Sequence, residues 1–292
     1  MGKDVIEDIA EAPARVLDTT ISTSGKVRDT ILKQKPVKSA KKYWELLGPG
    51  LTTGASDDDP SGIATYSQTG AKYGFGLLWM ALFTFPLMSN VQEMCARIGL
   101  VTGRGLAANI RKYFPNYIIY IASLLLFGAN TFNIGANLGA MAKATQLLLP
   151  NLNFAVLVVG FTVLMLFLQI FMPYEKYARY LKWMALVLLS YIFTVLVIKD
   201  INWNETLRAT VSPKIEFNKD QIILICAILG TTISPYLFFW QTSQEVEELQ
   251  EKSNNVKPTA NLVTKRTLRD MRIDVWSGMF LSNLVMFFII TA

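Results

Sequence analysis

Apolar residues gather along the chain in long runs that short polar or charged segments separate. Six runs approach the roughly 20 apolar residues that an α-helix needs to cross a bilayer. A soluble domain with one buried helix would contain one such run, so the pattern predicts an all-α protein that crosses the membrane repeatedly. The runs are Leu77–Cys95, Tyr117–Leu149, Phe154–Met172, Trp183–Ile198, Ile222–Trp240 and Met279–Thr291.

The start of the chain has a different character. Residues 1–44 are polar and contain nine Lys and Arg residues, and they lack the apolar centre of a signal peptide. We therefore expect a polar cytoplasmic tail over residues 1–44 and a transmembrane transporter domain over residues 45–292. A peripheral amphipathic helix near Val5–Leu17 is the alternative for part of the tail.

The positions of the basic residues predict one further crossing. Basic loops face the cytoplasm, and both the tail and the segment Arg97–Lys112 are basic. An even number of spans must separate them, yet only Leu77–Cys95 is clearly apolar. A hidden span is therefore predicted in Leu46–Ala71, which gives seven spans, a cytoplasmic N-terminus and an expected place in the plasma membrane. The chain stops at Ala292 within apolar sequence, which predicts a C-terminally truncated version of a longer protein.

The amino-acid composition excludes several kinds of metal site and catalytic site. The chain has no histidine, and its two cysteines, Cys95 and Cys226, lie in apolar runs without metal-ligand spacing. These facts exclude zinc–imidazole sites and histidine-based nucleophilic catalysis, so we expect no enzyme and no cofactor. The net charge of +6 follows from the tail and the loops between spans. It therefore predicts no nucleic-acid partner.

The hidden span contains three consecutive aspartates, Asp57, Asp58 and Asp59, followed by Pro60. Three carboxylates at bilayer depth would cost about 8–10 kcal/mol, unless they line a water-filled cavity. Pro60 and Gly62 interrupt the helix beside them, which frees backbone carbonyl groups and helix ends to meet an ion. An extramembrane loop is the alternative for the three aspartates.

The sixth span has a matching interruption at Pro235, which cannot donate to the helix ladder. Taken alone, this proline would be an ordinary kink. Two broken helices five spans apart are typical of inverted-repeat transporters, whose substrate site lies between the breaks.

These residues resemble the natural-resistance-associated macrophage protein (NRAMP) family of divalent metal transporters. The resemblance covers roughly residues 45–292 and implies a LeuT-type fold of two inverted five-span repeats. This chain would hold the first repeat and the start of the second, with the first and sixth spans discontinuous. The matching segments are Gly48–Gly50, Asp59–Pro60, Leu77–Trp79, Arg97–Gly103 and Gly230–Pro235.

The resemblance also implies a metal site, with departures. Asp59 stands at the metal-binding aspartate of the family, but Gly62 replaces its asparagine ligand and Ser234 its methionine. Tyr236 replaces a neighbouring histidine, and a metal-binding backbone carbonyl falls on Thr231. The candidate metal-site residues are Asp59, Thr231, Ser234, Ser61, Gly62, Asp58, Asp57 and Tyr236.

Loss of the thioether leaves oxygen ligands, which favour hard ions. Mg²⁺ sheds water reluctantly and binds through few carboxylates, so a partly hydrated Mg²⁺, with Mn²⁺ also accepted, is the expected substrate. The closest resemblance is to the NRAMP-related magnesium transporter branch, although some relatives with an altered methionine carry Al³⁺. The bilayer and the ion are the expected partners, with no obligate protein partner.

Proton coupling is expected to be absent. Proton-coupled family members keep acidic residues in the third span, where this chain has Asn133 and Ala136, and Gln241 replaces a second histidine. The asparagines Asn130, Asn133 and Asn137 either join helices by hydrogen bonds or line a hydrated path. Two alternative functions remain open: a carrier of amine-bearing organic substrates such as amino acids, and a channel, sensor or accessory membrane protein.

Overall fold

The structure is a computed structural model. By its internal contacts the chain divides into two units, Met1–Leu46 and Leu47–Ala292. Most of the predicted tail, residues 1–44, lies outside the described residues, so its expected form stays a prediction, and the account below concerns the second unit. The described residues are 43–44, 46–172, 180–181, 183–198, 201–252 and 263–292.

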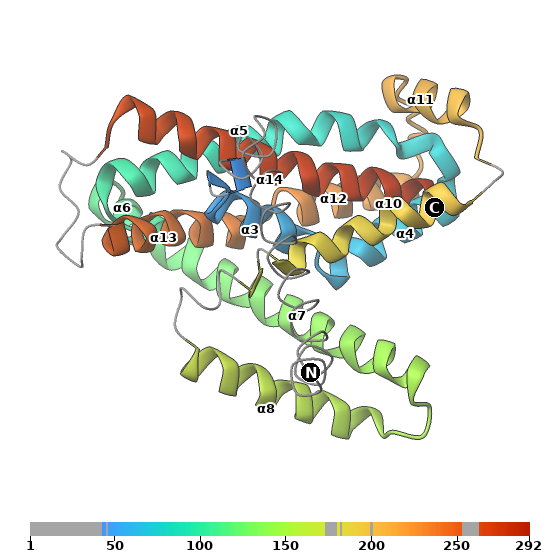
Figure 1. The fold of residues 1–292 in the computed structure, drawn as a ribbon, viewed down its shortest axis with the longest axis horizontal. Helices are drawn as coiled ribbons and strands as arrows, with labels where there is room; N and C mark the ends of the chain where they lie inside the picture. Colours follow the sequence, from blue (N-terminus) through green and yellow to red (C-terminus); the bar gives the residue numbers. More distant parts are fainter. Residues whose placement is uncertain (1–42, 45, 173–179, 182, 199–200, 253–262) are drawn as a thin grey trace, which may run out of the picture. The chain divides into compact units, whose positions relative to one another are not determined.

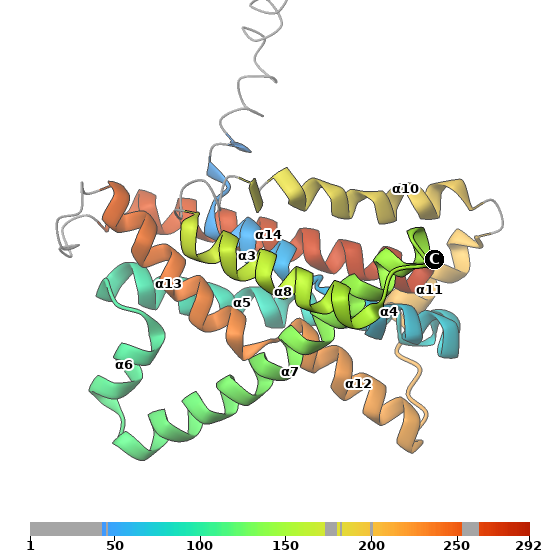
Figure 2. The ribbon, with the colours of Figure 1, turned by 90° about the horizontal axis from the view of Figure 1, so that it is seen from below.

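Helices build the second unit, and its described residues contain no β-strand, which confirms the predicted all-α class (Figures 1 and 2). The α-helices are α3 (Pro49–Asp57), α4 (Pro60–Tyr73), α5 (Trp79–Thr102), α6 (Leu106–Tyr113), α7 (Asn116–Leu148), α8 (Phe154–Phe171), α10 (Ser190–Val197), α11 (Trp203–Val211), α12 (Lys219–Thr232), α13 (Pro235–Lys252) and α14 (Lys265–Thr291). The 3₁₀-helices are η1 (Gly74–Leu77) and η2 (Ala185–Leu189).

Several helices are long and apolar enough to cross a membrane. Among the described residues, α7, α8, α14 and the stretch Lys219–Glu251 meet this test by length and composition. A fifth candidate combines Pro60–Leu77 with α5 across a bend of 106°. The predicted fifth span corresponds to the shorter apolar stretch Ala185–Val197. Helical structure is present in each predicted span, while the total of seven crossings and their orientation stay predictions.

Both predicted helix interruptions are present. In the first span, α3 ends at Asp57 and α4 begins at Pro60, and in the sixth, α12 ends at Thr232 and α13 begins at Pro235. Proline suits the first position of a helix because its missing N–H group would have no partner within the helix there. The same two prolines therefore end one helix and start the next.

Glycines allow α3 and α14 to pack backbone against backbone. A Cβ atom at Gly54 would lie 2.3 Å from the carbonyl oxygen of Gly278, and one at Gly278 would lie 2.0 Å from that of Gly50. Real Cβ atoms do not approach so closely, so no larger residue fits these positions without a shift of the helices. Small residues serve this purpose widely in membrane helix packing.

Asp274 of α14 also holds the beginning of α3. Its carboxylate accepts hydrogen bonds from the backbone N–H groups of Gly48 at 2.8 Å, Gly50 at 2.7 Å and Leu51 at 3.1 Å. These N–H groups belong to the first turn of α3, where no carbonyl within the helix can accept from them. A side chain 224 residues along the chain from Gly50 thus serves as the cap of this helix.

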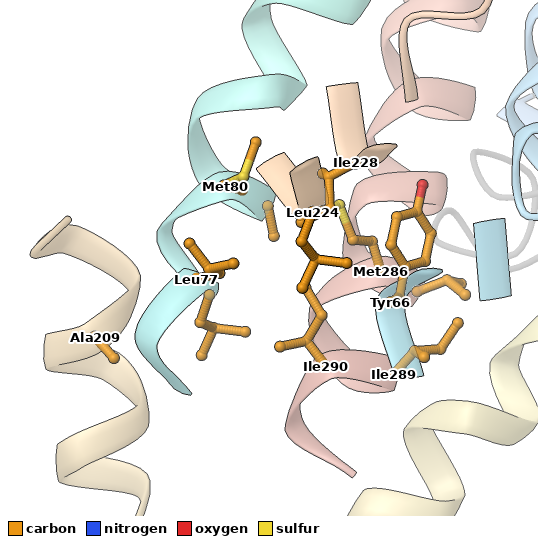
Figure 3. Close-up of a cluster of buried hydrophobic side chains, with 12 residues drawn as sticks. Tyr66, Leu77, Met80, Ala209, Leu224, Ile228, Met286, Ile289 and Ile290 are labelled. Carbon is orange, nitrogen blue, oxygen red and sulfur yellow. The ribbon is translucent and has the colours of Figure 1, made fainter. Parts of the chain in front are cut away.

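A cluster of buried apolar side chains joins the second half of the first span to the first half of the sixth (Figure 3). Tyr66 of α4 lies among side chains of η1, α5, α11, α12 and α14 and is fully buried. The cluster fixes α4 against α12, so the two helix breaks are held near one another. Its labelled members are Tyr66, Leu77, Met80, Ala209, Leu224, Ile228, Met286, Ile289 and Ile290.

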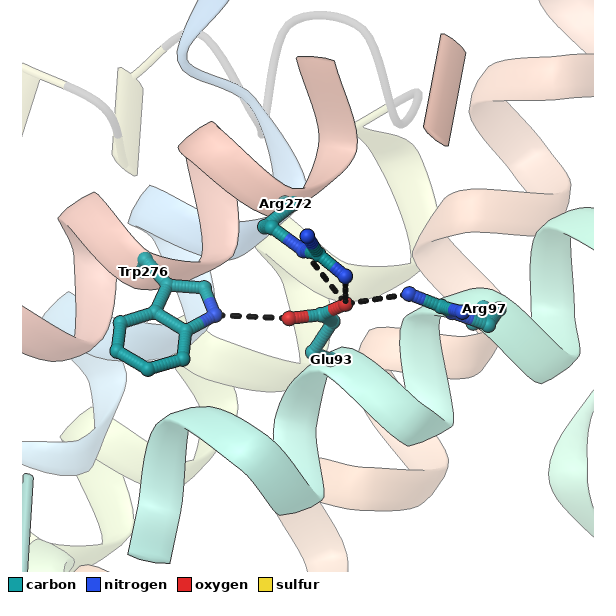
Figure 4. A network of polar contacts seen from close by, with 4 residues as sticks. All are labelled: Glu93, Arg97, Arg272 and Trp276. Carbon is teal, nitrogen blue, oxygen red and sulfur yellow. Dashed lines mark hydrogen bonds and ion pairs between the residues drawn. The ribbon is translucent and has the colours of Figure 1, made fainter. Parts of the chain in front are cut away.

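A polar network joins α5 to α14 (Figure 4). The Glu93 carboxylate accepts from Arg97 Nη2 at 2.6 Å, from Arg272 Nε at 2.8 Å and from Trp276 Nε1 at 2.8 Å. Glu93 is 7% exposed; the guanidinium groups of Arg97 and Arg272 balance its charge, and the Trp276 indole adds a neutral hydrogen bond. This glutamate therefore has a structural role between two neighbouring helices.

Candidate metal site at the two helix breaks

Asp59 lies immediately before α4 and caps its first turn. Its Oδ1 accepts from the backbone N–H of Gly62 at 2.9 Å and from Ser61 Oγ at 2.6 Å. Aspartate is a preferred residue at this position because its side chain satisfies an otherwise unpaired N–H group. The positive end of the helix dipole also favours a negative charge here.

The other carboxylate oxygen of Asp59 meets side chains from two further helices. Asn133 and Asn137 of α7 point their Nδ2 atoms toward Asp59 Oδ2, at 2.8 Å and 3.4 Å. Tyr236 of α13 places its hydroxyl 3.4 Å from the same oxygen. Residues of α4, α7 and α13 thus converge on one carboxylate, and all the donors are neutral.

The second break contributes hydroxyl and carbonyl oxygens. Ser234 Oγ donates to the carbonyl oxygens of Thr231 at 2.6 Å and Gly230 at 3.0 Å. The last carbonyl groups of a helix have no partner within it, so the Ser234 hydroxyl provides a hydrogen-bond donor for carbonyl groups at the end of α12. Tyr66 Oη lies 3.2 Å from Thr232 Oγ1, which ties α4 to this end.

Of the predicted site residues, Asp59, Ser61, Gly62 and Tyr236 form one group. Thr231 and Ser234 pair with one another at the second break, next to the start of α13. The Asp57 side chain points toward α14 and not toward Asp59, since its Oδ2 accepts a hydrogen bond from Ser282 Oγ at 3.0 Å. The oxygens of Asp58 have no hydrogen-bond partner among the described residues.

Two residues outside the predicted set, Asn133 and Asn137, reach the centre of the site. Their spacing of four residues places them on one face of α7, and that spacing is the signal that could have identified them. Gln241, which by the resemblance replaces a histidine, is fully buried. It accepts a hydrogen bond from Thr53 Oγ1 and donates to Glu245 Oε1 at 2.9 Å, so it joins α3 to α13.

A cation at Asp59 would meet one carboxylate and several neutral oxygens. Within the described residues, no three His, Cys, Asp or Glu side chains lie together as a metal-ligand group. The hydroxyl and amide side chains around Asp59 carry acceptor oxygens as well as donors, and they can reorient toward a positive ion. Oxygen donors of this kind suit hard cations.

Sequence comparison adds two related carriers. The chain is 28% identical over 231 residues to the divalent metal cation transporter MntH of Verminephrobacter eiseniae, which covers 75% of this chain and 51% of that protein. It is 28% identical over 209 residues to the metal transporter Nramp3 of Oryza sativa subsp. japonica, covering 69% of this chain and 36% of the relative. The chain thus spans about half the length, or less, of these curated relatives.

A solved structure has a similar fold. The crystal structure of the Eremococcus coleocola manganese transporter, in complex with an aromatic bis-isothiourea substituted compound, matches with a TM-score of 0.65 at 19% identity. The match covers 86% of this chain and 51% of that one. The predicted LeuT-type arrangement is thereby confirmed for the part of the fold that this chain contains. The chain also matches the natural resistance-associated macrophage protein-like (Nramp) family over residues 50–292, and it therefore belongs to that family.

Proposed function

We propose that the protein carries a hard divalent cation, Mg²⁺ with Mn²⁺ also accepted, through a site centred on Asp59. The observation that carries the proposal is the convergence of α4, α7 and α13 on the Asp59 carboxylate at a break between two helices. Relatives named as divalent metal and manganese transporters make a divalent cation the expected cargo.

The character of the donors favours a hard ion. Ser234 supplies a hydroxyl at the position where the family carries a methionine, and Asn133 and Asn137 supply amides. Oxygen ligands select Mg²⁺, Ca²⁺ and Mn²⁺ over softer metals. Mg²⁺ retains several waters and commonly uses one or two carboxylates, so a single carboxylate among neutral groups suits a partly hydrated ion.

The transport is proposed to be independent of protons. The groups that face Asp59 from α7 are amides, which cannot take up or release a proton. Two positive charges gain about 4.6 kcal/mol across a potential of about 100 mV. That free energy corresponds to accumulation on the order of a thousand-fold, so the membrane potential alone is a sufficient driving force.

The test uses the full-length protein in proteoliposomes under an inside-negative potential. Mg²⁺ and Mn²⁺ entry is followed together with an internal pH dye, for the natural sequence and for Asp59→Ala. Asp220→Ala is the control, because Asp220 lies in the first turn of α12 on an exposed face. Entry of both ions without acidification, lost in Asp59→Ala and kept in the control, is expected.

The same experiment separates the competing function. Metal flux that is indifferent to Asp59, or no metal flux at all, would reject this proposal. An amine-bearing organic substrate would then be tested next in the same vesicles, because Asp59 would attract an ammonium group and repel a carboxylate. Acidification in step with metal entry would reject only the proton-independent mechanism.

A further inference from the structure

Asp57 and Asp58 form a group that is separate from Asp59. Their side chains are 1% and 5% exposed, and their single described hydrogen bond joins Asp57 Oδ2 to Ser282 Oγ at 3.0 Å. The other three oxygens, Asp57 Oδ1 and both of Asp58, are buried without a hydrogen-bond partner among the described residues. Asp59, in contrast, is approached by five donors.

The location of the pair makes its negative charge unfavourable. Both residues lie at the C-terminal end of α3, where the helix dipole contributes partial negative charge. A buried carboxylate without donors or a positive partner costs several kcal/mol. Two such groups close together also repel one another, so the pair is stable either in its protonated form or with a bound cation.

The described surroundings do not supply that charge. Ser282 of α14 contacts Asp57, and the nearby Tyr66 hydroxyl is 3.2 Å from Thr232 Oγ1. None of these groups is basic, and in the described ranges of the chain neither aspartate has an ion pair with Lys or Arg. Ser282 does supply a hydroxyl oxygen, which is a hard ligand of the kind that suits hard cations.

We propose that Asp57, Asp58 and Ser282 form a second binding site for a hard divalent cation, distinct from the site at Asp59. Two carboxylates balance the charge of one divalent ion, whereas a monovalent ion would leave one negative charge buried. The Ser282 hydroxyl adds a neutral oxygen ligand, and the last carbonyl groups of α3 have no partner within the helix and are further candidates. The ion's identity rests on the proposed function, because the transported species is the available divalent cation.

The test counts bound Mn²⁺ on the full-length protein in detergent, using the electron paramagnetic resonance signal of free Mn²⁺ in sodium-free buffer. The natural sequence is expected to bind two ions per chain. Asp59→Ala and the double change Asp57→Asn with Asp58→Asn are each expected to bind one. Ser282→Ala keeps both carboxylates and is expected to weaken the second ion about ten-fold, which covers the case in which the double variant does not fold.

Ser277→Ala is the matched control, because Ser277 also lies on α14 and its hydroxyl donates to the backbone carbonyl of Ile273. One ion in the natural sequence, lost in Asp59→Ala and kept in the double variant, would overturn the second site while leaving the proposed function intact. Displacement of the second Mn²⁺ by about 100 mM Na⁺ would overturn its divalent character. No Mn²⁺ binding at all would reject both proposals.

Discussion

At the scale of single residues, Asp59 stands out because it has many partners and no positively charged one in the described part of the chain. Hydrogen bonds from Gly62, Ser61, Asn133, Asn137 and Tyr236 distribute its charge over three helices. An arginine or lysine at this place would compete with a cation for the carboxylate. Neutral donors instead stabilise the charge and still leave it available to an ion.

The Asn133 amide is expected to orient this carboxylate. Hydrogen bonds to a charged group contribute about 1.5–3 kcal/mol, so Asn133→Ala is expected to lower the initial rate of Mn²⁺ uptake at least ten-fold. Thr131→Ala is the control, since Thr131 also lies on α7 and its hydroxyl donates to the backbone carbonyl of Phe127. Equal rates in the two variants would show that the contact with Asp59 does not contribute.

The hydroxyl of Ser234 is expected to set the preference for hard ions. Ser234→Met introduces a thioether, a soft ligand that favours transition metals over Mg²⁺. Cd²⁺ should therefore inhibit Mg²⁺ uptake at a concentration at least ten-fold lower in Ser234→Met than in the natural protein. Ser234→Ala removes the hydroxyl without adding sulfur, and a similar gain of Cd²⁺ inhibition there would contradict the explanation.

Part of the geometry of this candidate site follows from the sequence alone. Asp59, Ser61 and Gly62 are neighbours along the chain, so a helix break at Pro60 brings them together without help from distant residues. The amides of α7 and the contact between Asp57 and Ser282 depend on how separate helices are rotated against each other. Nothing local in the sequence determines that rotation, and these contacts therefore became known only from the structure.

At the scale of helices, the α3–α14 contact is the least tolerant of change. Gly54→Ala would place a Cβ atom 2.3 Å from the Gly278 carbonyl oxygen, and over-packing of this kind typically costs about 1–3 kcal/mol or more. A clear fall in melting temperature, followed by thermal unfolding in detergent, is expected.

The control for that change is Gly128→Ala in α7, where a Cβ atom would meet no other atom within 4 Å. Alanine is about 1 kcal/mol more favourable than glycine in a helix. The control should therefore leave the melting temperature unchanged or raise it. A similar fall in both variants would mean that helix packing at Gly54 is not the cause.

The Glu93 network is expected to contribute stability rather than transport. Glu93→Gln keeps the side-chain shape but removes the charge that Arg97 and Arg272 share, at an expected cost of about 1–3 kcal/mol. Asp270→Asn should change stability by less, because its ion pairs are at 3.8 Å on an exposed surface. Chemical unfolding of both variants provides the measurement, and equal stabilities would contradict the assigned role.

Helix positions followed the sequence pattern closely, with one instructive exception. Long apolar runs identified α7, α8 and α14 directly, because length and apolar composition are the main requirements for a helix that lies in lipid. The first span, α3 and α4, contains glycines and three aspartates. Its mean hydropathy is therefore too low for a search for apolar runs to identify it. The count of basic loops predicts a crossing here, since that signal depends on which side of the membrane a loop occupies, and the structure has helices at this place.

At the scale of the whole molecule, a carrier that moves a divalent ion without protons transfers two positive charges in each cycle. Its steady-state accumulation of the ion should therefore depend on the membrane potential. A potential of about 60 mV is worth about 2.8 kcal/mol for a divalent ion, so the steady-state ratio of internal to external Mn²⁺ should approach a hundred-fold. Potassium gradients with valinomycin set the potential in proteoliposomes. Accumulation that changes with an imposed pH gradient at fixed potential would argue for proton movement.

The attachment of α3 to α14 restricts how α3 can move relative to α4. Three N–H groups of the first turn of α3 are held by Asp274, and glycines lock the two backbones together further along. Neither helix can move without the other, so α3 and α14 are expected to move as one rigid body. The helix α3 ends at Asp57 and α4 begins at Pro60, so a rotation of the α3–α14 pair relative to α4 would have to be absorbed by the backbone of Asp58 and Asp59. Under the proposed function, the aspartate that would hold the ion is therefore one of the two residues whose backbone such a rotation would change.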